Sequence, residues 1–123
     1  MVIAVVEDLL FSSKIRAVAK RLGVDVKFVR DAGAVVSEIR AARPRLVVFD
    51  LNADRLDPLG AARALRADPE LATIPTVGFV SHVQVELIGA ARTAGVGDVM
   101  ARSLFVARLA DLIAGGLPPP RPS

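Results

Sequence analysis

The sequence predicts an α/β domain in which five parallel strands form one sheet between two layers of helices. Short runs of β-branched and other apolar residues alternate with longer segments of helical periodicity, which is typical of repeated strand–helix units. The run Leu46-Val47-Val48-Phe49 is apolar without alternation, as expected for a strand that helices cover on both faces. With 123 residues, 53% of them hydrophobic, the chain is long enough to build one domain around a substantial core.

Five strands and five helices account for most of the chain. We expect the strands at the short apolar runs, approximately 2–6, 24–29, 45–50, 75–80 and 97–101. The helices are expected where apolar residues recur at three- and four-residue spacing, approximately 10–22, 32–42, 59–68, 83–94 and 104–114. In chain order, the residues that make this spacing are Ile15, Val18 and Leu22; Val35, Val36 and Ile39; Ala62 and Leu65; Leu87, Ile88 and Ala91; and Phe105, Leu109, Leu112 and Ile113. Helix-breaking residues follow the last four helices, namely Pro44, Asp68-Pro69, Gly95 and Gly115-Gly116.

These five units predict a flavodoxin-like (βα)5 three-layer sandwich. The units are expected to be joined by right-handed crossovers, and this fold has the strand order 2-1-3-4-5, which puts the first and third strands side by side at the topological switch point. We expect this domain to span residues 1–115. The proline-rich segment 116–123 predicts an extended, polyproline-like flexible tail, either a free terminus or the start of a linker.

The composition excludes several classes of protein. The absence of cysteine rules out disulfides and cysteine metal sites. The net charge of +3 comes from basic residues spread over several segments, and there is no Tyr or Trp for base stacking, so we expect no direct nucleic-acid binding. The apolar runs are far shorter than the roughly 20 residues of a membrane span, and no signal-peptide pattern precedes the first strand. We therefore expect a cytoplasmic protein without membrane contact.

Three carboxylates stand where two of the predicted strands end. Glu7 and Asp8 close the first apolar run, and Asp50 closes the third. Because neighbouring parallel strands end at the same edge of a sheet, the three acids are expected to converge there, where open α/β sheets bind their ligands. Buried carboxylates are costly unless a cation compensates them, which favours a magnesium-sized hard cation. The alternatives are that Glu7 and Asp8 cap the following helix and that Asp50 is a solvated loop residue.

Two further strand ends carry polar groups. The fourth strand ends at Ser81, and the fifth ends at Arg102. An acid pair, a central Asp, a hydroxyl and a cation at the ends of strands one, three, four and five resemble the receiver domain of two-component response regulators (CheY-like). The resemblance covers residues 2 to about 114.

The resemblance implies a signalling switch rather than a metabolic enzyme. Asp50 would accept a phosphoryl group from a sensor histidine kinase or a phosphotransfer protein, acting as a carboxylate nucleophile. Mg²⁺ would be held by Glu7, Asp8, Asp50 and the backbone carbonyl of Asn52. Ser81 and Arg102 would bind the phosphoryl oxygens. The output would be protein–protein contact, with a possible homodimer through the 83–114 face.

Four positions depart from the family and make this an atypical member. Arg102 replaces the family's lysine, and Arg is longer, planar and forked. Ser103 replaces a proline that follows a cis peptide bond, so we expect another path for the chain there. Val99 replaces the switch aromatic, and His82 stands where a small residue is usual. His82 either covers the Asp50 pocket or is a merely exposed loop residue.

These departures leave a second function open. The chain can instead be a pseudo-receiver, a protein interaction module whose action does not depend on phosphorylation. Ser81 serves equally well as a helix cap, and Arg102 can pair structurally with Asp98 or another acid. Asp54 and Asp57 are interpreted as turn and capping residues. A flavodoxin-like binder of small molecules is disfavoured, because no glycine-rich phosphate loop follows the first strand.

Overall fold

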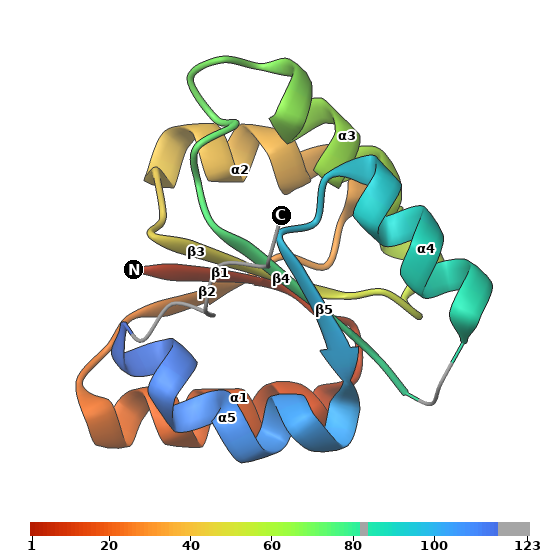
Figure 1. Cartoon of the computed structure of the whole chain (residues 1–123). Helices are drawn as coiled ribbons and strands as arrows, with labels where there is room; N and C mark the ends of the chain where they lie inside the picture. Colours follow the sequence, from red (N-terminus) through yellow and green to blue (C-terminus); the bar gives the residue numbers. More distant parts are fainter. Residues whose placement is uncertain (82–83, 116–123) are drawn as a thin grey trace.

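A computed structural model describes residues 1–81 and 84–115 as a parallel sheet covered by helices on both faces (Figure 1). The sheet has five strands in the order β2-β1-β3-β4-β5, and every neighbouring pair is parallel. The strands are β1 (Val2–Val5), β2 (Val26–Phe28), β3 (Leu46–Asp50), β4 (Thr76–Val80) and β5 (Asp98–Ala101). The helices are α1 (Leu9–Leu22), α2 (Val35–Ala42), α3 (Pro58–Ala67), α4 (Val85–Ala94) and α5 (Arg102–Ala114), with short 3-10 helices η1 (Ala32–Ala34) and η2 (Asp54–Leu56). The predicted fold class is confirmed.

Each face of the sheet has its own hydrophobic core. Helices α1 and α5 lie side by side on one face, and α2, α3 and α4 cover the other (Figure 1). Alternate residues of β1 supply the two cores: Val2 and Ala4 face α1 and α5, whereas Ile3 and Val5 face α2 to α4. Burial of β1 on both faces explains why its sequence is apolar without alternation.

Two elements are shorter or less regular than the sequence predicts. Strand β2 covers three residues rather than 24–29, because it is the edge strand and pairs with β1 alone. The helix predicted at 32–42 begins as the 3-10 turn η1, where the Asp31 carboxylate accepts a hydrogen bond from the Gly33 backbone N–H at 3.0 Å. This local bond satisfies an early backbone donor and gives the first turn its tighter geometry.

Helix α5 begins two residues earlier than predicted. Ala101 is extended, and the helix starts directly at Arg102, which therefore stands in the first turn of α5 instead of closing a strand. No cis peptide bond occurs within the described ranges, so the chain enters α5 by another path than a cis bond before Ser103. His82 and the predicted tail 116–123 lie outside the described residues, as does the first residue of the helix predicted at 83–94.

Candidate functional site

Asp50 is the last residue of the central strand β3. It is 6% exposed and is one of two buried polar residues in the described part of the chain. Its Oδ1 accepts a hydrogen bond from the Asn52 backbone N–H at 3.0 Å. Burial raises the pKa of the Asp50 carboxyl above its usual value, although the Asn52 bond and the Arg102 charge act to lower it. The alternative of a solvated loop residue is therefore wrong.

Asp8 is the N-terminal cap of α1. Its Oδ1 accepts hydrogen bonds from the backbone N–H groups of Leu10 and Phe11, at 2.9 and 3.1 Å. Its second oxygen, Oδ2, lies 3.6 Å from Arg102 Nη2. The capping interpretation is thus confirmed for Asp8, and it accounts for only one of the two carboxylate oxygens.

Glu7 faces the loop that follows β3. Its Oε1 accepts a hydrogen bond from Arg55 Nη1 at 3.0 Å, and the Arg55 side chain is 86% exposed. A pair this exposed contributes little to stability. The charges of Glu7 and Asp8 nevertheless raise the pKa of Asp50, which indicates that the three acids share one electrostatic environment.

Arg102 lies against an aromatic cluster. Its guanidinium carbon is 4.4 Å from the centroid of the Phe11 ring and 5.7 Å from that of Phe79. Phe11, Phe79 and Phe105 are in mutual contact, with ring centroids 4.7 to 5.9 Å apart. Arg102 Nε is buried and has no hydrogen-bond partner in the described part of the structure. This aromatic support was not predicted from the sequence, where Phe11, Phe79 and Phe105 lie far apart in three different predicted elements.

The strand register explains why these residues meet. Asp50 is level with Phe79 in the β3–β4 pair, and Ala101 is level with Val80 in the β4–β5 pair. Arg102 therefore follows β5 at the height where Ser81 follows β4. Arg102 pairs with Asp8, so the structural alternative of an acid partner is realised with a different acid from Asp98.

Asn52 joins the two loops beside Asp50. Its Oδ1 accepts hydrogen bonds from the Ser81 backbone N–H at 2.8 Å and the Ser81 hydroxyl at 3.1 Å. Its Nδ2 donates to Gln84 Oε1 at 2.6 Å. The family resemblance implied only a backbone role for Asn52. Its side-chain contacts were not predicted, because contacts between two loops leave no periodic signal in a sequence. The Ser81 hydroxyl is engaged with Asn52 in this state.

Glu7 and Asp8 are close enough to Asp50 to raise its pKa. Each of the three carboxylates nevertheless accepts hydrogen bonds from a different part of the chain. Among residues 1–81 and 84–115, no group of three or more His, Cys, Asp or Glu side chains is gathered in a way that could hold a metal ion. Asp57 caps α3 through the Gly60 N–H at 3.2 Å, as expected, and Asp54 begins η2. The predicted metal ligands thus remain a prediction.

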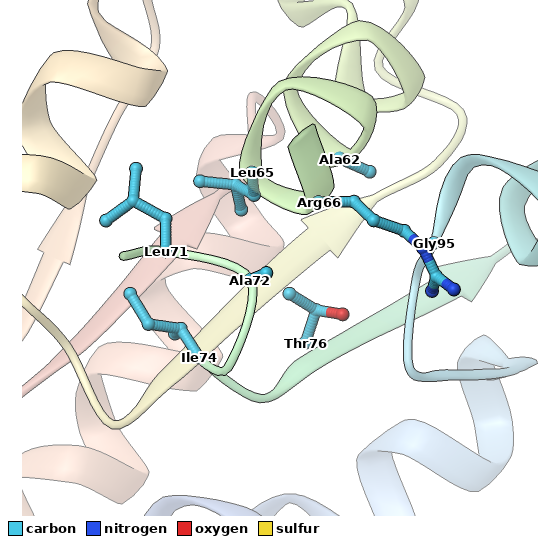
Figure 2. A pocket seen from close by; sticks show the side chains of 8 residues that line it. All are labelled: Ala62, Leu65, Arg66, Leu71, Ala72, Ile74, Thr76 and Gly95. Atoms are coloured by element: carbon cyan, nitrogen blue, oxygen red, sulfur yellow. The ribbon is translucent and has the colours of Figure 1, made fainter. Parts of the chain in front are cut away.

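A separate cavity lies at the amino-terminal end of β4, away from the strand ends where Asp50 lies (Figure 2). Its volume of about 30 Å³ is suited to a single water molecule. Thr76, the first residue of β4, lines it, and the Arg66 side chain extends past Gly95 along its rim (Figure 2). The cavity is too small for a metabolite and distant in register from Asp50.

The structure is similar to solved response regulator receiver domains. A response regulator from Hahella chejuensis matches with a TM-score of 0.83 and 18% identity, covering 99% of this chain and 98% of that one. The receiver domain of a sensor histidine kinase from Pseudomonas aeruginosa, with magnesium in its active-site cleft, matches with a TM-score of 0.79 and 21% identity over 91% and 92%. The manganese-bound form of response regulator Rcp1 matches with a TM-score of 0.72 and 20% identity over 93% and 88%. The chain therefore has the receiver-domain fold.

Comparisons by sequence added nothing to this likeness. No family model and no curated protein matched the chain. Within the described ranges, no helix has the length and apolar character needed to cross a membrane.

Proposed function

We propose that this chain is a phosphorelay receiver that accepts a phosphoryl group on Asp50 and signals through protein contacts. The observation that carries the proposal is the position of Asp50. It is a buried carboxylate at the central strand end of a receiver fold, and the charges of Glu7, Asp8 and Arg102 all act on it. A buried acid with a perturbed pKa beside charged partners is characteristic of a functional site.

The chemistry assigned to Asp50 is a group transfer. A carboxylate oxygen of Asp50 attacks the phosphorus atom of a phosphohistidine on a sensor kinase or phosphotransfer protein. A P–O bond forms and the P–N bond breaks, and its electron pair returns to the imidazole nitrogen. The chain is then an acyl phosphate, which water later hydrolyses. The protein catalyses only this transfer and the later hydrolysis, which releases inorganic phosphate and restores the Asp50 carboxylate, as expected of a signalling domain rather than a metabolic enzyme.

The residues at this edge fit a hard divalent cation in their chemistry. Asp8, Asp50 and Glu7 offer carboxylate oxygens, and the carbonyl of Asn52 accepts one hydrogen bond, from the Asp54 N–H at 3.0 Å, which leaves a second lone pair. The mutual effect of the acids on the pKa of Asp50 is the kind of repulsion that a cation relieves. We assign Mg²⁺ to these ligands; when bound, it neutralises charge on the transferring phosphoryl oxygens.

Arg102 and Ser81 are assigned to the phosphoryl group itself. The guanidinium of Arg102 presents parallel donors that match two phosphoryl oxygens, and its buried Nε–H is still without a partner in the described structure. The Ser81 hydroxyl donates to Asn52 in the present state, so it must exchange that bond to reach an acyl phosphate at Asp50. This exchange would move the start of α4 and so alter a surface that a partner can read.

The partners follow from this chemistry. A histidine kinase or phosphotransfer protein lies upstream, and the downstream protein is expected to contact α4, β5 and α5, a face that can also pair with a second copy of the chain. Because a histidine kinase draws its phosphate from cytoplasmic nucleotide, we assign the protein to the cytoplasm.

Intact mass spectrometry after treatment with acetyl phosphate and Mg²⁺ tests the proposal. The wild-type chain should gain one phosphoryl group that is lost at alkaline pH, as an acyl phosphate is. Asp50→Ala should gain none. Asp54→Ala, which removes a nearby exposed acid, should behave as wild type. Phosphorylation of Asp50→Ala, or no phosphorylation of the wild-type chain, would contradict the proposal.

The pseudo-receiver remains the second candidate, and one feature of β5 favours it. The strand is Asp98-Val99-Met100-Ala101, so it has no aromatic ring to couple Asp50 to the outer surface. Backbone NMR shifts of α4 and α5 distinguish the two functions. Phosphorylation should move them in a receiver, whereas in a pseudo-receiver they stay in place even though Asp50 is labelled.

A further inference from the structure

Asp8 has a single carboxylate oxygen left for a cation. Its Oδ1 is committed to two backbone N–H groups at the start of α1, at 2.9 and 3.1 Å. These are the donors that would otherwise be unsatisfied at a helix N-terminus. Oδ2 therefore is the oxygen through which Asp8 can bind a metal, and Arg102 Nη2 lies 3.6 Å from it.

The guanidinium of Arg102 is held at this place from a second side. It lies 4.4 Å from the Phe11 ring centroid and 5.7 Å from that of Phe79, in a cluster whose rings are themselves packed together. A guanidinium on an aromatic face is favourable because the ring quadrupole attracts the cation. Arg102 thus has both an acid partner and an aromatic support for its position beside Asp8.

A divalent ion and the Arg102 guanidinium repel each other if both lie beside Asp8 Oδ2. A divalent ion bound to Asp8 Oδ2 and Asp50 would bring two positive charges against the guanidinium at short range. Either the metal binds weakly or Arg102 leaves Asp8. The pair with Asp8 also leaves one donor of the guanidinium unsatisfied, because the buried Nε–H of Arg102 has no partner in the described structure.

We infer that Arg102 is the site's resident counter-cation: it occupies Asp8 when no divalent ion is present, lowers the affinity of the site for that ion, and is displaced from Asp8 when the ion binds. This inference rests on the proposed function in one respect, that the three acids take a divalent cation. The proposed function assigns Arg102 to the phosphoryl group, whereas this inference assigns it a second role, in which it lowers the affinity of the site for the metal without any contact with phosphate.

Calorimetric titration of the full chain with Mn²⁺ and with Mg²⁺ tests the inference without any phosphoryl donor. Arg102→Gln should bind either ion about five- to twentyfold more tightly than wild type, since the pair with Asp8 and the stacking on Phe11 no longer compete. The matched control is Arg40→Gln, which removes an equal charge from an ion pair with Asp68 at 2.7 Å, outside the site. This variant should bind the metal as wild type does.

A second measurement follows Arg102 itself. In ¹H–¹⁵N spectra that include arginine side chains, the Arg102 Nε–H signal should shift as Mg²⁺ is added to the wild-type protein. The Arg40 Nε–H signal should not. This readout needs neither activity nor a phosphorylated chain.

The outcomes separate the inference from the proposed function. Tighter binding by Arg102→Gln, together with a shift of the Arg102 signal in wild type, supports both. Metal binding that is equal or weaker in Arg102→Gln, or an Arg102 signal indifferent to Mg²⁺, overturns the inference and leaves the metal site standing. Absence of binding in wild type and in both variants overturns the two together.

Discussion

At the scale of single residues, the cost of keeping Asp50 charged is the property that most shapes the site. Asp50 is buried, and its two acidic neighbours act against its ionisation, whereas one backbone N–H and Arg102 support it. Desolvation is the largest of these influences, so folding makes the charged carboxylate of Asp50 less favourable than it is in the unfolded chain. A cation that binds beside Asp50 would offset this cost.

Asp50→Asn should stabilise the metal-free protein at neutral pH, because it removes a buried charge that desolvation penalises. Because the folded pKa is raised above the usual 3.8, wild-type stability falls as pH rises through the interval between the two values and stays reduced above it. The advantage of the variant should thus be full at pH 7 and shrink toward pH 3.8. Urea unfolding in the presence of EDTA measures it.

Asp54→Asn is the control for this prediction, because Asp54 is exposed at the start of η2. The free energy of unfolding of Asp54→Asn should equal that of the wild-type protein at every pH. A stabilisation of Asp50→Asn that persists unchanged in acid would show that the gain does not come from charge.

At the scale of elements, helix starts and loops position the site. Helix α1 is capped at its start by Asp8 and at its end by Gly23, which adopts φ 69° in the left-handed region that favours glycine. The same Asp8 is a cap and a site residue, so local helix chemistry and function share one side chain. Asn52 likewise serves the loop after β3 and the start of α4 at once.

The two roles of Asp8 can be separated by substitution. Asp8→Asn retains a side-chain oxygen for the Leu10 and Phe11 N–H groups, so its stability in EDTA should stay close to wild type. Asp8→Ala loses the cap and should be less stable by about 1 kcal/mol. Both variants should bind Mn²⁺ weakly. If Asp8→Asn unfolds as readily as Asp8→Ala, the charge of Asp8 matters more to α1 than its cap does.

Asn52→Ala should loosen the connection between the loops that flank Asp50. The change removes the bonds to Ser81 and Gln84, and the Ser81 amide should exchange its hydrogen roughly tenfold faster, which corresponds to about 1.4 kcal/mol. Hydrogen exchange by NMR measures this. Gln84→Ala removes one arm of the same network and should affect Ser81 less. Equal exchange rates in the two variants would mean that the bond to the Asn52 side-chain oxygen Oδ1 does not protect the Ser81 amide.

The sequence predicts elements better than it predicts contacts between them. The buried run that ends at Asp50 is unambiguous, because a strand covered on both faces has few polar residues. The start of α5 at Arg102 was not predictable, since no Gly or Pro marks the boundary after β5. The stacking of Arg102 on Phe11 was also missed, because it depends on how two helices pack on one face of the sheet.

At the scale of the whole molecule, the site is built from residues distant in sequence that only the complete sheet brings together. Glu7 and Asp8 follow β1, Asp50 ends β3 and Arg102 follows β5. In an unfolded chain Asp50 is far from Glu7 and Asp8, so the three acids bind no common ion. Occupation of the site is consequently linked to global folding, and the free energy of unfolding reports on it.

Mg²⁺ should therefore raise the stability of the wild-type protein. At a concentration 100 times its dissociation constant, a ligand specific for the folded state adds about 2.7 kcal/mol to the free energy of unfolding. Urea unfolding with increasing Mg²⁺ at constant ionic strength should show a midpoint that rises with the logarithm of the Mg²⁺ concentration. Asp50→Asn should lose most of this rise, because it removes a charged ligand, whereas Asp54→Asn should retain it. A midpoint that rises equally in Asp50→Asn would mean that Mg²⁺ stabilises the fold from a place other than the strand ends.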